Sequence, residues 1–194
     1  MVKSEVQELC KNIYAKHKKA LDLIYEYKPD LQMEVHDYLT SLVESNDELI
    51  IDEGAKSYVR FGVKSWDVEM LKKGEGSSKR ILLFEFYITQ NILILSLVIR
   101  QGDSTTRQRI YDTAKGKTNL FRSAKRNLSQ QYFSIYSKRL LSQNNYEDAT
   151  IETLRPQIKK KWESFLSDDF RRILEVIDEK FIRIRGSTSR KKRV

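Results

Sequence analysis

Apolar residues recur every three or four positions over the first part of the chain. One such stripe runs from Ser4 to Tyr27 without Gly or Pro, and a second runs from Leu31 to Val43. This spacing predicts two amphipathic helices. Pro29 ends the first helix, because the residue before a proline is driven out of the helical region. The short connection between them predicts an antiparallel helical hairpin over residues 1–46.

The middle of the chain changes from a helical period to a strand period. Glu48–Asp52 and Ser57–Val63 are short and rich in β-branched and aromatic residues, and Asp52-Glu53-Gly54 between them predicts a turn. Arg80–Ile88 and Ile92–Arg100 are longer and apolar at successive positions. In a strand with one face exposed to solvent, apolar and polar residues alternate. These two strands do not show that alternation, so we expect them to be central strands, covered on both faces by helices or by a partner.

The last part of the chain returns to helices. Ser104 is a candidate cap for a helix from Thr105 to Lys115, and Gln131–Leu141 is read as a further strand. Two apolar stripes, Leu154–Leu166 and Phe170–Phe181, predict C-terminal helices. Because strands and helices do not alternate, the fold class is α+β, with a central, mostly antiparallel sheet of about four to five strands.

The length of 194 residues is that of one domain. We expect a single α+β domain over residues 1–186, with the hairpin over 1–46, the sheet region over 47–145 and the C-terminal helices over 146–186. Residues 187–194 are Ser, Thr, Arg, Lys and Val, a composition that predicts a disordered basic tail.

The composition excludes several classes of protein. The longest apolar run, Ile92–Ile99, is far shorter than the roughly 20 residues that span a bilayer, so we expect no membrane partner. The N-terminal segment does not look like an export signal, and Cys10 is the one cysteine. An internal disulfide and a thiolate zinc site are therefore excluded, and we expect a cytoplasmic protein without a metal or other cofactor.

The positive charge is concentrated in two segments. The net charge is +9, but residues 1–60 carry eight basic and twelve acidic side chains. Residues 100–145 carry ten basic and two acidic ones, and residues 183–194 carry six basic and no acidic ones. A cluster of this kind is typical of phosphate binding, although carboxylates of the N-terminal helices offer a way to neutralise it within the fold.

Aromatic residues are interleaved with the cations of the central basic segment, and aromatic rings stack on unpaired bases. The residues that we expect to bind DNA or RNA are Arg100, Arg107, Arg109, Lys115, Lys117, Arg122, Lys125, Arg126, Lys138, Arg139, Arg190, Lys191, Lys192 and Arg193. The N-terminus of the helix at Ser104–Thr106 offers a further place for a phosphate oxygen.

A nuclease site is not complete in this sequence. Restriction-type chemistry needs clustered carboxylates for Mg²⁺, with an acid-x-Lys triplet on a strand. Neither long strand has that triplet, since Glu85 is followed by Phe86 and Tyr87. We expect no catalytic residue and no metal ligand. Glu85 lies among apolar residues, and its charge is expected to pair with a basic side chain, either across the sheet or from the Thr105 helix.

A pattern of aromatic and apolar positions over residues 10–170 resembles a known region. The pattern consists of Ile13-Tyr14, Leu23-Ile24-Tyr25, Pro29-Asp30, Tyr58-Val59-Arg60-Phe61, Trp66-Asp67, Leu83-Phe84-Glu85-Phe86, Leu97-Val98-Ile99, Gly102 and Arg107. It resembles the region C-terminal to the catalytic domain in certain bacterial and phage PD-(D/E)XK nuclease superfamily proteins. The resemblance implies a bacterial or phage setting, in a defence or counter-defence system. In those proteins the catalytic residues lie upstream of this region, so none is carried over.

These observations predict a non-enzymatic accessory protein that binds DNA or RNA and works beside a separately encoded nuclease or other subunit. Two alternatives remain open: a protein-interaction module, acting as an inhibitor or complex subunit that binds an acidic protein, and a divergent metal-dependent nuclease.

Overall fold

The computed structural model describes residues 3–27 and 30–182. The chain divides into two compact units, Met1–Asp30 and a second one that begins at Leu31, whereas the sequence suggested a single domain over residues 1–186. The basic tail predicted for residues 187–194 lies outside the described residues.

The first unit is the helix α1 (Lys3–Tyr27), at the position predicted for it. Its regular geometry is interrupted at His17, where φ is −121° and ψ is 22°. A hydrogen bond crosses this interruption, because the hydroxyl of Tyr14 donates to Asp22 Oδ1 at 2.9 Å. Many of the apolar side chains of α1 are exposed, Leu9 by 52% and Ile24 by 60%.

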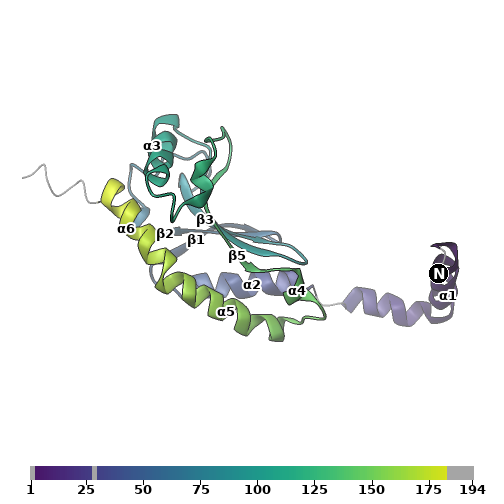
Figure 1. Cartoon of the computed structure of the whole chain (residues 1–194). Helices are drawn as coiled ribbons and strands as arrows, with labels where there is room; N and C mark the ends of the chain where they lie inside the picture. The colour runs from purple at the N-terminus through teal and green to yellow at the C-terminus, as the bar shows by residue number, and fades with distance from the viewer. Residues whose placement is uncertain (1–2, 28–29, 183–194) are drawn as a thin grey trace, which may run out of the picture. The chain divides into compact units, whose positions relative to one another are not determined.

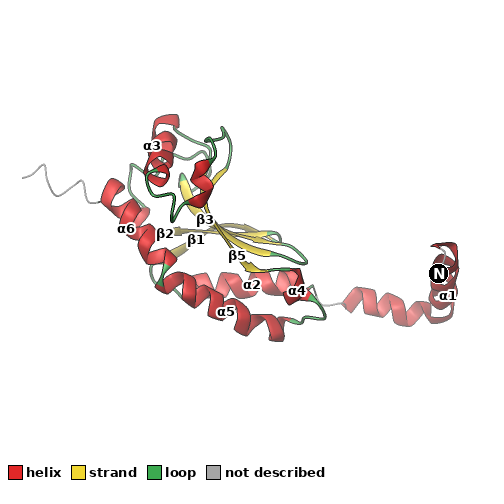
Figure 2. Cartoon of the chain, in the orientation of Figure 1, coloured by secondary structure: helices red, strands yellow, loops and turns green. Residues whose placement is uncertain are grey.

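The second unit contains five strands with helices before, between and after them (Figures 1 and 2). In chain order its elements are α2 (Leu31–Glu44), β1 (Leu49–Ala55), β2 (Tyr58–Val63), the short 3₁₀ helix η1 (Lys64–Trp66), β3 (Leu82–Ile88), β4 (Leu93–Ile99), α3 (Ser104–Lys115), the 3₁₀ helix η2 (Arg122–Lys125), β5 (Phe133–Leu141), α4 (Gln143–Tyr146), α5 (Ile151–Ser167) and α6 (Asp169–Phe181). The predicted α+β class, with N-terminal helices, an antiparallel sheet and C-terminal helices, is confirmed.

The five strands form one antiparallel sheet in the order β1-β2-β3-β4-β5. Each strand is therefore hydrogen-bonded to its neighbours in the sequence, as expected for short connections between adjacent elements. The predicted strands Arg80–Ile88 and Ile92–Arg100 become β3 and β4, in the interior of the sheet.

One face of the sheet is buried beneath α2, α5 and α6 (Figure 1). Phe84 lies at its centre and is fully buried. Its ring centroid is 5.4 Å from that of Phe61 on β2, 5.6 Å from that of Phe165 on α5 and 5.8 Å from that of Phe170 on α6. Offset and edge-on aromatic pairs at these distances add to the free energy of burial. This cluster fixes which side of each strand faces the helices.

The opposite face of the sheet is covered only in part. Leu83 and Val98 point to this face and are buried, whereas Tyr87 is 47% exposed. α3 contacts the other face, because the ring of its Tyr111 lies 5.7 Å from that of Phe133, which is paired with Ile99 and so lies on the side of Leu82 and Phe84. The expectation that β3 and β4 are covered on both faces by helices or by a partner is therefore met by helices for the face that carries Phe84.

Asp52 and Glu53 do not form the predicted turn. β1 continues to Ala55, and its pairing with β2 is irregular between Ile51 and Gly54. A bulge of this kind redirects side chains, and here the two carboxylates meet arginines. Arg80 Nη1 lies 3.0 Å from Asp52 Oδ2, and Arg100 Nη2 lies 3.3 Å from Glu53 Oε2.

The substitution Phe84→Ala is expected to lower the free energy of unfolding by about 3–5 kcal/mol, because it opens a cavity among packed rings. Tyr87→Ala, on the exposed side of the same strand, is expected to cost less than about 1 kcal/mol. Urea denaturation of both variants measures the difference. Equal losses would contradict the assignment of the two faces.

Candidate nucleic-acid interface

The ten cations predicted for residues 100–145 do not form one surface. Arg100 is 7% exposed and pairs with the bulge of β1, with its Nη1 also 3.4 Å from Asp52 Oδ1. Lys138 on β5 points toward the helices and lies 2.8 Å from Asp169 Oδ2. Each of these two residues forms an ion pair within the fold. The prediction that they contribute to a nucleic-acid surface is therefore wrong.

Arg107 on α3 is likewise a structural residue. It is 5% exposed, and its guanidinium donates hydrogen bonds to the carbonyl oxygens of Ser129, Gln130 and Gln131. Burial lowers the pKa of Arg107, and the charge of Glu75 acts in the opposite direction. The side chain therefore holds the segment that leads into β5 and is not available to a phosphate.

Two further cations of α3 are exposed but rest on aromatic rings. The guanidinium carbon of Arg109 lies 5.1 Å from the ring centroid of Phe181, and its Nη2 donates to the carbonyl of Lys180 at 3.1 Å. Lys115 Nζ lies 5.5 Å from the ring centroid of Tyr111. Cation–π contact orients a side chain and leaves its charge in place.

The remaining cations of this region lie in the turn after α3 and in η2. Lys117, Arg122, Lys125 and Arg126 are exposed, and none of them makes an ion pair among the described residues. With Arg109 and Lys115 they form a group that we call the α3–η2 cations. Within residues 109–126 the only acidic residue is Asp112, and that carboxylate accepts a hydrogen bond from Gln108. The segment therefore keeps a strong positive charge at its surface.

The other predicted cations lie elsewhere. Arg139 is exposed on β5, on the side of the sheet away from the helices. Arg190, Lys191, Lys192 and Arg193 lie outside the described residues.

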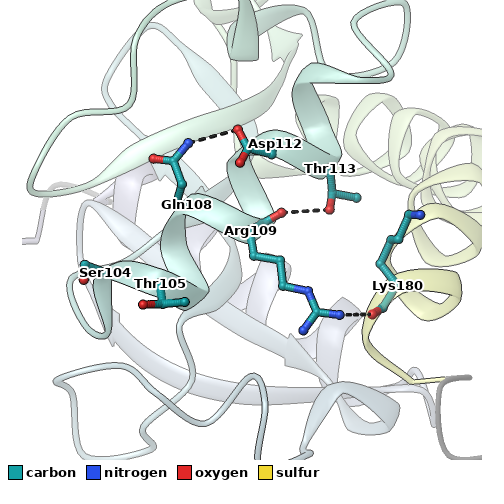
Figure 3. A pocket seen from close by; sticks show the side chains of 7 residues that line it. All are labelled: Ser104, Thr105, Gln108, Arg109, Asp112, Thr113 and Lys180. Carbon is teal, nitrogen blue, oxygen red and sulfur yellow. Dashed lines mark hydrogen bonds between the residues drawn. The ribbon is translucent and has the colours of Figure 1, made fainter.

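A shallow hollow of about 890 Å³ lies beside α3 (Figure 3). Ser104, Thr105 and Arg109 line it, together with Lys180 of α6. The N-terminus of α3 is not open to a phosphate here, because Asp103 caps it. Asp103 Oδ2 accepts hydrogen bonds from the backbone N–H and the hydroxyl of Thr106, both at 2.7 Å.

The hydrogen bonds from Thr106 lower the pKa of Asp103, so its carboxylate is charged at neutral pH and repels an anion. The predicted cap, Ser104, is instead the first residue of α3. The predicted phosphate position at Ser104–Thr106 is therefore wrong, since an acidic residue one position earlier occupies it.

Glu85 has the cross-strand partner that its position required. Arg60 on β2 is directly opposite Glu85 on β3, and Arg60 Nε donates to Glu85 Oε2 at 2.6 Å. Tyr58 and Tyr132 flank this pair through contacts with the guanidinium. Tyr132 is one of the aromatic residues interleaved with the cations of the basic segment, whereas Arg60 and Tyr58 were not candidate site residues. The signal that points to them is Arg60 at an alternate position in an otherwise apolar strand.

Comparison with known proteins identifies no relative. No protein-family model matches the chain, and no curated protein and no solved structure is significantly similar to it. In residues 3–27 and 30–182, no three His, Cys, Asp or Glu side chains gather as a metal site would require. Over the same residues, no helix has both the length and the apolar character needed to cross a membrane.

The substitution Arg107→Ala is expected to lower the free energy of unfolding by about 1–3 kcal/mol, because three carbonyl oxygens lose hydrogen bonds from a charged donor. Arg122→Ala, which removes an exposed cation, is expected to change it by no more than about 0.5 kcal/mol. Chemical denaturation of the two variants measures both values. A neutral Arg107→Ala substitution would argue against a structural role.

Asp169 makes the stability of the fold sensitive to acid. Burial acts to raise the pKa of Asp169, but hydrogen bonds from Lys138 and Tyr136 outweigh burial and lower it below its ordinary value. A lowered pKa contributes stability above the unfolded-state pKa of about 3.9, and this stability is lost as the pH falls through the folded-state pKa.

Asp169→Asn is therefore expected to be less stable than the natural chain by about 1–3 kcal/mol at neutral pH. This difference is expected to shrink as the pH falls below about 4. Urea titrations at a series of pH values measure it. A difference that stays constant with pH would contradict the charge pairing.

Proposed function

We propose that the protein binds DNA or RNA through the α3–η2 cations, as a non-enzymatic accessory protein of a bacterial or phage nuclease or defence system. The setting comes from the sequence resemblance alone, whereas the binding surface is argued from the structure. Arg139 and the basic tail are proposed to add phosphate contacts.

One observation carries this proposal. Lys117, Arg122, Lys125 and Arg126 are exposed and make no ion pair among the described residues, while other cations of the basic region are used inside the fold. A fold that neutralised all its cations internally would leave little attraction for a polyanion. Exposed, unpaired cations release the counterions of a phosphate backbone, which is the main source of affinity in non-specific nucleic-acid binding.

The proposed contacts are made by lysine and arginine side chains, which favours backbone contact over sequence-specific recognition. Lysine and arginine contacts to phosphates position a protein on nucleic acid and carry no sequence information by themselves. We therefore expect strong salt dependence and weak preference for sequence.

The proposal is tested by a charge reversal of η2 and its flank. The variant Arg122→Glu/Lys125→Glu/Arg126→Glu is expected to bind a labelled DNA or RNA oligonucleotide at least about tenfold more weakly than the natural chain. The slope of log affinity against log salt concentration is expected to fall by about one for each phosphate contact that is lost. Fluorescence anisotropy at a series of salt concentrations measures both quantities.

The matched control is Lys159→Glu/Lys160→Glu/Lys161→Glu on α5, which lies well apart from α3 (Figure 1). It changes the net charge by the same amount, so a general loss of positive charge affects both variants equally. The proposal requires the control to keep most of the affinity. If the natural chain shows no salt-sensitive binding to DNA or RNA, or if both variants lose it equally, the proposal is wrong. Co-purification of an acidic protein in place of nucleic acid would favour the protein-interaction alternative.

A further inference from the structure

The partly open face of the sheet presents two rows of side chains. The register of the strands places Arg60 opposite Glu85, Glu85 opposite Ser96 and Ser96 opposite Ser137. In the next row the same pairing connects Tyr58, Tyr87, Ile94 and Arg139. We call these two rows the open sheet face. The hydroxyls of Ser96 and Ser137 lie 3.4 Å apart, which confirms that the two side chains point the same way.

Tyrosine rings surround a guanidinium on this face. The guanidinium carbon of Arg60 lies 4.2 Å from the ring centroid of Tyr58 and 5.4 Å from that of Tyr132. Tyr87 is directly opposite Tyr58 across the strands. Tyr87 and Tyr132 are each 47% exposed. The face therefore offers flat π surfaces to solvent beside its charged side chains.

A hollow of about 380 Å³ lies between the first row and Tyr132, and Val98 and Ser134 line it on the side away from the second row. Its walls include Arg60, Glu85, Ser96 and Ser134. Arg60 is already balanced by carboxylates, with Glu85 at 2.6 Å and Glu53 at 3.5 Å. A phosphate that entered this hollow would meet the carboxylate of Glu85 and would be repelled.

The chemistry of the hollow suits a neutral planar group with N–H donors. Oε2 of Glu85 is engaged by Arg60, whereas Oε1 accepts no hydrogen bond from the described residues and is able to accept one from a ligand. Serine hydroxyls can donate or accept. Nucleobases are planar and neutral, and their exocyclic amino groups donate hydrogen bonds.

We propose that the open sheet face, together with Tyr132, binds the bases of single-stranded nucleic acid while the α3–η2 cations bind its phosphates. This inference rests on the proposed function and adds the class of nucleic acid. Unpaired bases stack on aromatic side chains with little regard to sequence. A duplex buries the faces of its bases inside its own stack, so it gains nothing from these tyrosines.

The chain connects the two surfaces directly. Residues 127–132 run from the end of η2 to Tyr132, and Arg107 holds the carbonyls of residues 129–131. Arg139 stands at the end of the row that contains Tyr58 and Tyr87. A single strand that lies along this path meets cations at both ends and aromatic rings between them.

The experiment uses the full chain with the substitutions Tyr87→Ala and Tyr132→Ala, singly and combined. The probes are a labelled single-stranded oligonucleotide and a duplex of the same sequence, in DNA and in RNA. Each substitution is expected to weaken single-strand binding at least about fivefold. Duplex binding and the salt dependence of single-strand binding are expected to stay unchanged, because no charge is removed.

Two controls separate stacking from other effects. Tyr25→Ala removes a tyrosine that is 76% exposed in α1, and it is expected to leave binding unchanged. Tyr87→Phe and Tyr132→Phe keep the rings and are expected to bind as the natural chain does. If the alanine variants do not fold, Tyr87→Leu and Tyr132→Leu fill the space without a π face and are expected to show the same loss.

The outcomes distinguish this inference from the proposed function. Binding of neither probe by the natural chain would overturn both. Normal binding of the natural chain, with single-strand affinity unchanged in the folded tyrosine variants, would overturn base stacking alone. An equal loss for single strand and duplex would also overturn it. If the tyrosine variants change an oligomer into a monomer and leave single-strand affinity unchanged, the face is an interface between copies of the chain and the inference is wrong.

Discussion

The structure of the second unit depends on burying one aromatic face of its sheet. On that face Phe84 packs against Phe165 and Phe170 of the C-terminal helices, and Phe61 beside it packs against Trp162. Since side chains alternate along a strand, this choice sends Arg60 and Glu85 to the opposite face. A register slip by one residue would bring these charges into the core and expose the rings. The positions of the polar groups on the open sheet face are therefore a consequence of hydrophobic packing.

The excess positive charge serves two different purposes. Arg80 and Arg100 meet the carboxylates of the β1 bulge, and the side chain of Asp52 is wholly buried between them. Such cations hold separate parts of the chain together, and their charge is cancelled locally. Arg122 and its neighbours have no such partners among the described residues and extend into solvent. The net charge of the chain is therefore a poor measure of the positive charge that a polyanion can contact. The charge of the exposed α3–η2 cations is the better measure.

The strands and the longer helices were predictable from the sequence, because each of them carries its own periodic signal. The boundaries of β3, β4 and α6 lie within two residues of those predicted. The candidate site was less predictable, because the burial of an arginine depends on residues far along the chain. Arg107 binds carbonyls 22 to 24 residues away, and backbone carbonyls leave no mark in the amino-acid pattern. The sequence predicted that Glu85 pairs with a basic side chain, since a carboxylate in an apolar strand requires a cation. Identifying that partner as Arg60 required the register of β2 and β3.

Arg107 also bears on how the two proposed surfaces work together. Its guanidinium anchors the stretch between η2 and β5 at three successive carbonyls, so that stretch is fixed to α3 instead of hanging as a loose loop. Ligands that touch two surfaces lose affinity when those surfaces must first be brought into alignment. Because these hydrogen bonds form when the chain folds, the entropic cost of ordering the segment is not added to the free energy of binding. The buried Arg107 thereby fixes the position of the open sheet face relative to the exposed arginines of the α3–η2 cations.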